Sequence, residues 1–238
     1  MPVFLVINLI QPIIWLLLFG QLFKAVVRIP GFAAGGSFLE FLTPGVIMMT
    51  ALLASVWAGT TYIQDMERGV MDRMLTSPVS RGAVMASTLA YQSIVSTIQT
   101  LVVVGIALMA GARFPGGVVG VLTTIFAAVL LTIAFAAISN AVALVVRQQQ
   151  ALIGISQLLT LPLMFASSAT MDTGLAPSWV RAVARFNPME WAVSTSRSAL
   201  SAKPDWSDIA THLVLLALLA AVLGLVATRA FRTYQRSA

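Results

Sequence analysis

Long apolar segments alternate with short polar ones along the whole chain. A transmembrane helix needs about 20 mostly apolar residues, and six segments meet that requirement. The expected spans cover residues 2–23, 41–63, 83–110, 117–146, 151–170 and 209–231. The pattern therefore predicts an all-α integral membrane protein with six transmembrane helices, in which residues 1–238 form a single transmembrane domain. An even number of spans places both termini on the same side of the membrane.

The densest run of charge lies between the second and third expected spans, at residues 65–82. Its charged residues are Asp65, Glu67, Arg68, Asp72, Arg73 and Arg81. Apolar residues recur in the same segment at helical spacing, at Met66, Val70, Met71, Met74 and Leu75. Pro78 cannot continue a helix, so this amphipathic helix is expected to end near Ser77. The pattern fits a helix that presses on a partner outside the bilayer, and it equally fits a solvated loop that only sets topology.

Two further short helices are expected between the fifth and sixth spans. Pro177 can start the first of them, in which Trp179 lies on an apolar stripe. Asn187 and Pro188 then interrupt the chain, and a second helix is predicted over residues 189–200. Such segments lie along the membrane interface or dip partway into the bilayer, so we expect short re-entrant helices on the extracytoplasmic side.

The composition supports a membrane protein and excludes several kinds of chemistry. The chain is 59% hydrophobic and 9% charged, whereas soluble domains carry roughly 25% charged residues. The sequence contains no phosphate-binding Gly-x-x-x-x-Gly-Lys-Ser/Thr loop and no cysteine. Its single histidine, His212, has no cluster of Cys, His or Glu residues beside it. We therefore expect no enzymatic activity, no metal site and no directly bound cofactor.

Basic residues indicate the orientation of the chain and its contact with lipid. The net charge of +6 comes mainly from basic residues near span ends, where they orient spans and meet anionic lipid, so nucleic acid is not expected as a partner. The basic residues divide equally between the two sides, but the loops on the side of residues 65–82 are shorter, and Arg229, Arg232 and Arg236 anchor the tail there. The first span lacks the basic flank of a signal peptide and is expected to be retained. Both termini are predicted to be cytoplasmic, in a multi-pass plasma-membrane protein.

The spans contain polar groups but no charge near their centres. Glu40 and Arg147 lie at span edges, so the intramembrane ionisable group that proton- or sodium-coupled carriers use is missing. Polar side chains gather in the second and fifth spans, the latter also containing Pro162. They are Thr50, Ser55, Trp57, Thr60, Thr61, Tyr62, Gln64, Ser156, Gln157, Thr160, Ser167 and Ser168, with Met164 and Phe165 beside them. They fit either hydrogen-bonded helix packing or an adaptable path for an amphiphilic substrate.

Two motifs resemble those of a known family. Residues 67–81 begin with Glu-Arg-Gly and end with Leu-Thr-Ser-Pro-Val-Ser-Arg. Residues 175–179, Leu-Ala-Pro-Ser-Trp, are followed by Phe-Asn-Pro-Met at 186–189 and then by Arg197. Together with the order of the six spans, these motifs resemble the ABC-2 type permease family, the membrane subunits of ATP-driven exporters. Within that family the chain is most similar to daunorubicin-resistance-type drug-efflux permeases.

The resemblance implies a mechanism and a set of site residues. The segment after the second span would be a coupling helix that docks on a separate cytoplasmic ABC ATPase subunit, which holds ATP and Mg²⁺. A second permease copy or a paralogue would complete the transporter. The coupling residues would be Met66, Glu67, Arg68, Val70, Asp72, Arg73, Met74, Leu75, Pro78 and Arg81. The translocation path would include Trp57, Thr61, Ser156, Gln157, Thr160, Met164 and Phe165. The extracytoplasmic gate would include Pro177, Trp179, Asn187, Pro188 and Arg197.

Several functions fit these features. The favoured one is export of a hydrophobic or amphiphilic compound such as a drug, an antibiotic or a lipid. Export of a polysaccharide or glycolipid is the alternative within the family. A non-transporting membrane anchor and a proton-coupled carrier that uses Glu40 and His212 are alternatives of another class. Members of the family usually begin with an amphipathic elbow helix, whereas this sequence begins at the first span, so we expect either a start assigned downstream of the elbow or no elbow.

Overall fold

Helices account for the regular structure in the described part of the chain. The computed structural model describes residues 2–22, 37–68, 81–169 and 177–234. The helices are α1 (Pro2–Leu22), α2 (Phe38–Val56), α3 (Ala58–Glu67), α5 (Arg81–Met109), α6 (Gly117–Val146), α7 (Gln149–Phe165), α8 (Ser178–Ala184), α9 (Pro188–Leu200) and α10 (Trp206–Tyr234). Within these residues there is no β-strand, so the all-α prediction is confirmed for the described chain.

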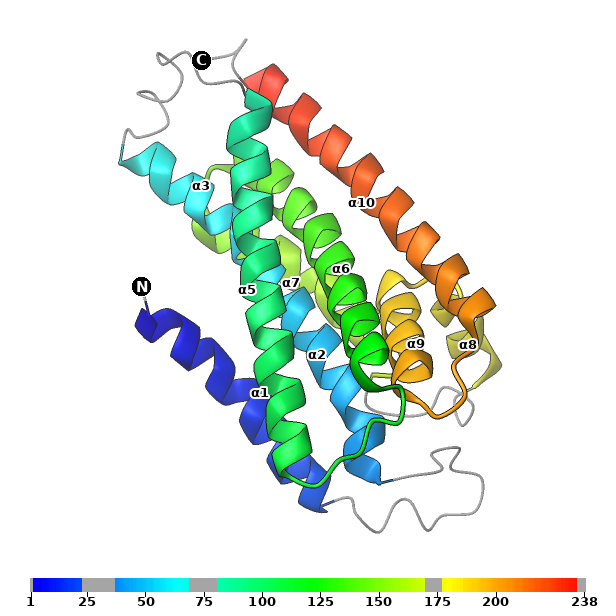
Figure 1. Cartoon of the computed structure of the whole chain (residues 1–238). Coiled ribbons are helices and arrows are strands. Elements are labelled where there is room, and N and C mark those ends of the chain that lie inside the picture. Colours follow the sequence, from blue (N-terminus) through cyan, green and yellow to red (C-terminus); the bar gives the residue numbers. More distant parts are fainter. Residues whose placement is uncertain (1, 23–36, 69–80, 170–176, 235–238) are drawn as a thin grey trace.

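Helix α6 is the centre of the bundle. It contacts α2, α3, α5, α7, α9 and α10, and Figure 1 shows α5, α6 and α10 running lengthwise beside one another. Its buried surface is rich in alanine, including Ala127, Ala128, Ala134 and Ala137. Small side chains let helix backbones approach closely where no hydrophobic effect drives them together. The composition of α6 therefore explains why so many helices can pack on it.

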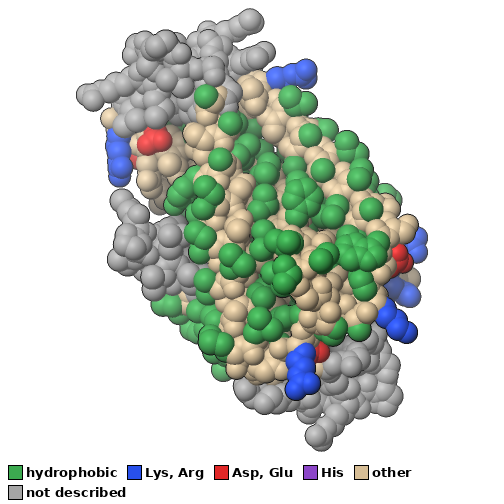
Figure 2. Space-filling model, in the orientation of Figure 1, with side chains coloured by type: hydrophobic (Ala, Val, Ile, Leu, Met, Phe, Trp, Pro, Cys, Tyr) green, Lys and Arg blue, Asp and Glu red, His purple; other side chains and the backbone are tan. Residues whose placement is uncertain are grey.

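Four of the helical segments are long and apolar enough to cross a membrane. They are Phe38–Glu67, Met85–Met109, Gly117–Val146 and Trp206–Arg229. Hydrophobic side chains are spread along the whole face seen in Figure 2, and charged side chains appear toward its two ends. Shorter apolar helical stretches occupy Ile10–Gly20 and Gln149–Phe165 among the described residues. The structure thus supports a multi-pass membrane protein, while the first and fifth expected spans stay predictions.

Two of the expected spans have a different form from the simple helix that the hydropathy predicts. The second is interrupted at Trp57, which separates α2 from α3. The helix over the fifth ends at Phe165, whereas the expected span runs to residue 170. Both differences arise from hydrogen bonds with residues far away in the sequence.

The two expected short helices before the last span are both present as helices. Helix α8 begins directly after Pro177, and α9 begins with Asn187 as its N-cap and Pro188 as its first residue. They lie at the same end of the bundle as the start of α2, and α3 and the first turn of α5 reach the opposite end (Figure 1). Their re-entrant position in a membrane stays a prediction.

Candidate functional site

A cavity of about 280 Å³ opens between α1, α2, α5 and α7, beside the interruption at Trp57. Its polar lining consists of amides and hydroxyls from Gln11, Thr50, Gln99, Gln157 and Thr160. Trp15, Trp57, Met49 and Met164 supply large polarizable surface. The described residues that line it include no charged side chain. Pockets of this kind, mostly apolar with a few polar groups, are typical small-molecule sites.

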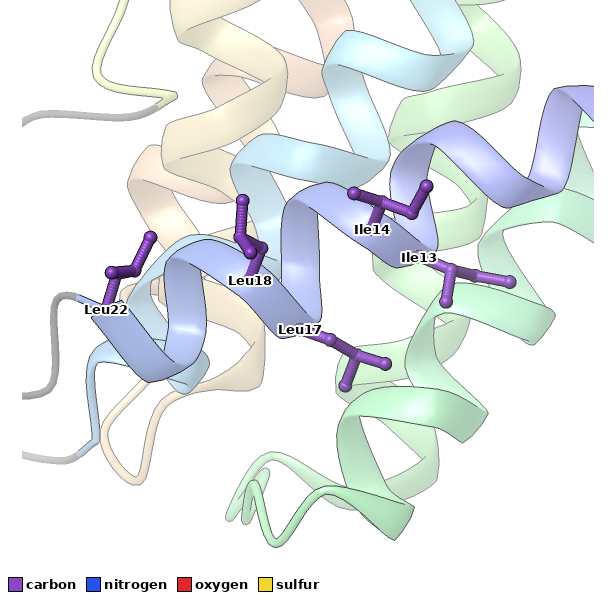
Figure 3. Close-up of a pocket in the computed structure, with 5 residues that line it drawn as sticks. All are labelled: Ile13, Ile14, Leu17, Leu18 and Leu22. Carbon is purple, nitrogen blue, oxygen red and sulfur yellow. The ribbon is translucent and has the colours of Figure 1, made fainter.

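A second hollow on the outer face of α1 has a different character. Figure 3 shows that its lining comes from one helix, with five aliphatic side chains from Ile13, Ile14, Leu17, Leu18 and Leu22. It is larger, at about 570 Å³, yet these residues offer no polar side chain that could orient a ligand. Such a surface fits the acyl chains of membrane lipid. We therefore place the candidate site in the cavity lined by Gln99 and Trp57.

The interruption of the second span at Trp57 exposes backbone groups that a distant residue satisfies. The Thr60 backbone N–H donates to Trp57 O rather than to Val56 O. The Ser139 hydroxyl, on α6, donates to Val56 O (2.7 Å) and accepts from the Gly59 N–H (3.1 Å). Both backbone groups that the break frees are thus paired, as burial requires. The break turns Trp57 toward the cavity, where its side chain is 40% exposed.

Replacing Gly59 by alanine is expected to destabilise the folded protein by about 1–3 kcal/mol. A Cβ at this position would lie 2.4 Å from Ser139 O, so α3 would have to move away from α6. Gly105 is the matched control in α5, because a Cβ there meets no heavy atom within 4 Å. In an unconstrained helix the same exchange stabilises by roughly 0.5–1 kcal/mol. Thermal unfolding of the detergent-solubilised variants, followed by tryptophan fluorescence, measures the difference, and equal unfolding temperatures would contradict the close approach.

Asn187 connects the end of α7 to the start of α9. Its amide nitrogen donates to Leu163 O (2.7 Å) and to Ala166 O (2.9 Å), two carbonyls at the end of α7. Its side-chain oxygen accepts from the Met189 backbone N–H (2.9 Å) and so caps α9. The last carbonyls of a helix have no partner within it. Asn187 therefore explains how α7 can end at Phe165, before the expected end of the span.

Glu190 and Arg197, both on α9, hold Ser168 between them. The Glu190 carboxylate accepts from the Ser168 hydroxyl (2.9 Å) and from its backbone N–H. The Arg197 guanidinium donates to Ser168 Oγ (3.0 Å), to Ser168 O (2.8 Å) and to Phe41 O (3.3 Å). It also lies 3.9 Å from the centre of the Phe41 ring, within the range of a cation–π contact. These bonds join α9, α2 and the chain after α7 into one cluster.

The structure describes only the beginning of the predicted coupling segment. Met66 and Glu67 end α3, with Met66 half-buried and Glu67 exposed, and Arg68 follows as an exposed C-cap. Arg81 is the first residue of α5. The other predicted coupling residues, Val70, Asp72, Arg73, Met74, Leu75 and Pro78, lie outside the described residues. Their role in coupling stays a prediction.

The predicted path residues fall into two groups. Trp57, Gln157, Thr160 and Met164 line the cavity together. Thr61, Ser156 and Phe165 are not part of its lining; Ser156 is buried, and the other two are exposed.

The predicted gate residues lie at α8 and α9. Asn187 and Arg197 belong to the contacts around α9, and Pro188 starts that helix. Pro177 and Trp179 are exposed at α8.

Sequence reasoning missed three residues that the structure brings to these places. Gln99 is a single polar residue in the third expected span with nothing in the sequence to distinguish it, yet it lines the cavity from α5. Glu190 was not singled out, although an acidic residue in the first turn of a helix beside a membrane is a usable signal. Nothing in the sequence around Ser139 indicates its role, because its hydrogen-bond partners lie about eighty positions earlier. In the described residues, no three His, Asp or Glu side chains form a group that could hold a metal ion.

Comparison with known proteins decides the family. A family model described as "ABC-2 type transporter" matches residues 1–201. The chain belongs to the ABC-2 type transporter family. The family predicted from the motifs at residues 67–81 and 175–197 is thereby confirmed, and this ABC-2 protein has the apolar helices of a membrane permease.

Several relatives of this ABC-2 protein have names that mention drug resistance. The daunorubicin resistance ABC transporter permease protein DrrB1 of Streptomyces coeruleorubidus is 28% identical over 97% of this chain and 80% of its own length. The probable doxorubicin resistance ABC transporter permease protein DrrC of Mycobacterium tuberculosis is 24% identical over 74% of this chain and 63% of its own. A putative transport permease, ycf38 of Cyanophora paradoxa, is 30% identical over 82% of this chain and 67% of its own.

Proposed function

We propose that this chain is the membrane-spanning subunit of an ATP-driven exporter that moves a hydrophobic or amphiphilic compound out of the cell. The observation that carries the proposal is the cavity at Trp57, which is uncharged, aromatic and amide-lined. A site of this composition can bind apolar compounds that carry a few hydrogen-bonding groups. The names of the drug-resistance permeases among its relatives support the same substrate class.

The position of the cavity also supports a mechanical link to a partner. Trp57 lines the cavity at the break in the second span, and α3 continues from this break to Glu67, where the predicted coupling segment begins. A movement of that segment would be carried by α3 to the cavity wall. The energy would come from a cytoplasmic ABC ATPase subunit that holds ATP and Mg²⁺, so this permease would itself be non-catalytic.

The complete transporter would pair this chain with a second permease copy or a paralogue in the plasma membrane, with both termini cytoplasmic. In that arrangement α8 and α9 would form the extracytoplasmic gate, because they lie at the end of the bundle opposite to α3 (Figure 1). The cluster around Arg197 would then hold the gate to α2.

Two observations favour this mechanism over a proton-coupled carrier. The Glu40 carboxylate is engaged in capping α2 with Ser37 and accepts from the Arg113 backbone N–H (2.9 Å). His212 lies 3.3 Å from Asp208 at the start of α10, away from the middle of that helix. A coupling group is instead expected inside the membrane, on the ion pathway.

Replacing Glu67 or Arg73 by glutamine is expected to lower export about tenfold, the equivalent of roughly 1.4 kcal/mol of lost contact with the ATPase. Glu67 is exposed at the end of α3, so the fold should persist. The measurement is export and ATP hydrolysis in membranes that contain the permease and its co-purified ATPase. Arg181→Gln, an exposed change on α8, is the control at the other end of the bundle. Normal export by both coupling variants, or the lack of any ATPase in the purified complex, would overturn the proposal.

A further inference from the structure

The cavity contains a buried amide whose hydrogen-bonding capacity is not used. Gln99 is 4% exposed, and within the described residues its Oε1 has no hydrogen-bond partner. Across the same cavity Thr160 is 2% exposed, and its Oγ1 is likewise without a partner there. Gln99 belongs to the span Met85–Met109 and lies more than a helical turn from either end. An unsatisfied polar group at that depth is costly, and a ligand hydroxyl in the cavity would supply the missing partner.

The surroundings of Gln99 define what such a ligand can be. Trp15 and Trp57 are each 40% exposed and present ring surface to the cavity. Trp15 is held in place by stacking on Phe19, with ring centroids 4.6 Å apart and planes inclined by 6°. Flat aromatic compounds match such ring surfaces. Because no charged side chain lines the cavity, an ionic ligand would lose its hydration without gaining a counter-ion.

We propose that the cavity binds an uncharged, hydroxylated aromatic ring system whose hydroxyl group pairs with the side-chain amide of Gln99. A hydroxyl both donates and accepts, so it can donate to Oε1 and accept from the amide nitrogen. Thr160 offers a second hydroxyl on the facing helix. The volume of about 280 Å³ suits one fused bicyclic ring rather than a large compound. This inference rests on the proposed function, since it names the substrate class of the same cavity.

The test is equilibrium binding to the purified full chain in lipid nanodiscs, with empty nanodiscs as the blank. The probes are 2-naphthol, which carries a free hydroxyl, and 2-methoxynaphthalene, in which that hydroxyl can no longer donate. We expect 2-naphthol to bind about tenfold more tightly than its methyl ether, because the ether cannot form the buried hydrogen bond to Oε1 of Gln99. Equal affinity of the two probes would overturn the proposal.

Variants of Gln99 test whether this residue causes the difference in affinity between 2-naphthol and its methyl ether. Gln99→Leu is expected to weaken 2-naphthol binding about tenfold and to weaken 2-methoxynaphthalene binding less, because the ether oxygen can only accept from the amide nitrogen. Continued binding of the ether also shows that the cavity is intact. The same variant is expected to unfold at a temperature equal to or higher than that of the unsubstituted protein, because it removes an unpaired buried amide. Gln92→Leu, two helical turns earlier on α5 and outside the cavity lining, is the control and should alter neither affinity. Unchanged 2-naphthol binding by Gln99→Leu would refute the role of Gln99.

A charged probe tests the remaining part of the proposal. The cation 2-naphthylmethylammonium should bind more weakly than 2-naphthol, and tighter binding of the cation would overturn the assignment to uncharged compounds. These measurements need neither ATP nor a partner subunit. A protein that binds 2-naphthol as expected but fails to export would therefore contradict the proposed function alone, and an exporter without this selectivity would contradict the inference alone.

Discussion

Replacement of Gly45 by alanine is expected to lower the free energy of unfolding by about 3 kcal/mol. A Cβ on Gly45 would lie within 3 Å of three backbone atoms of Ala169. Backbone atoms cannot rotate away as the end of a flexible side chain can, so α2 would have to separate from the segment after α7. The same movement would pull Phe41 and Ser168 apart and break the Arg197 contacts that join them.

Thermal unfolding and the yield of monodisperse protein after solubilisation measure the effect of Gly45→Ala. Gly154→Ala on α7 is the matched control, because a Cβ there meets no heavy atom within 4 Å. The control should unfold at the same temperature as the unsubstituted protein or slightly above it, since alanine has the higher helix propensity. A Gly45→Ala protein as stable as the control would show that α2 does not pack on Ala169 as described.

Replacement of Arg197 by methionine is the second change with a large expected effect. Its guanidinium donates to Ser168 Oγ, Ser168 O and Phe41 O. Hydrogen bonds to charged groups contribute about 1.5–3 kcal/mol each, and part of this is lost to solvent because the side chain is half-buried. We expect Arg197→Met to lower the free energy of unfolding by roughly 2–3 kcal/mol.

Arg197→Lys separates charge from geometry in this cluster. Lysine keeps the positive charge but lacks the planar fork that reaches three acceptors at once. We therefore expect Arg197→Lys to lower the free energy of unfolding, but by less than Arg197→Met does. Arg181→Met is the control, because Arg181 is exposed on α8. Unfolding temperatures in detergent provide the measurement. If Arg197→Met unfolded at the same temperature as Arg181→Met, the cluster would not contribute to stability.

Local features of the sequence were sufficient to predict several helices. The predicted range 117–146 coincides with α6, and the second short helix predicted at 189–200 corresponds to α9, which begins one residue earlier at Pro188. Hydropathy indicates α6 because its apolar run is continuous, and Asn187 followed by Pro188 indicates the start of α9 because both residues favour a helix N-terminus. Signals of this kind depend on neighbouring residues alone.

The interruption at Trp57 could not be predicted in the same way. The apolar run continues through residues 41–63 without proline near the break, so hydropathy indicates one helix. The break is stable because Ser139, brought close by the packing of α3 on α6, pairs with Val56 O and Gly59 N. A side chain on another helix thus decides where the hydrogen-bond ladder of the second span stops.

The sequence by itself determined that this protein is helical, lies in a membrane and belongs to the ABC-2 type transporter family, because hydropathy and short motifs are local properties. Only the tertiary structure decided which polar residues act together. Gln99 shares a cavity with Thr160 of another helix, and Arg197 reaches the carbonyl of Phe41 across 156 positions. Such contacts follow from how whole helices pack around α6, and no pattern along a single helix contains that information.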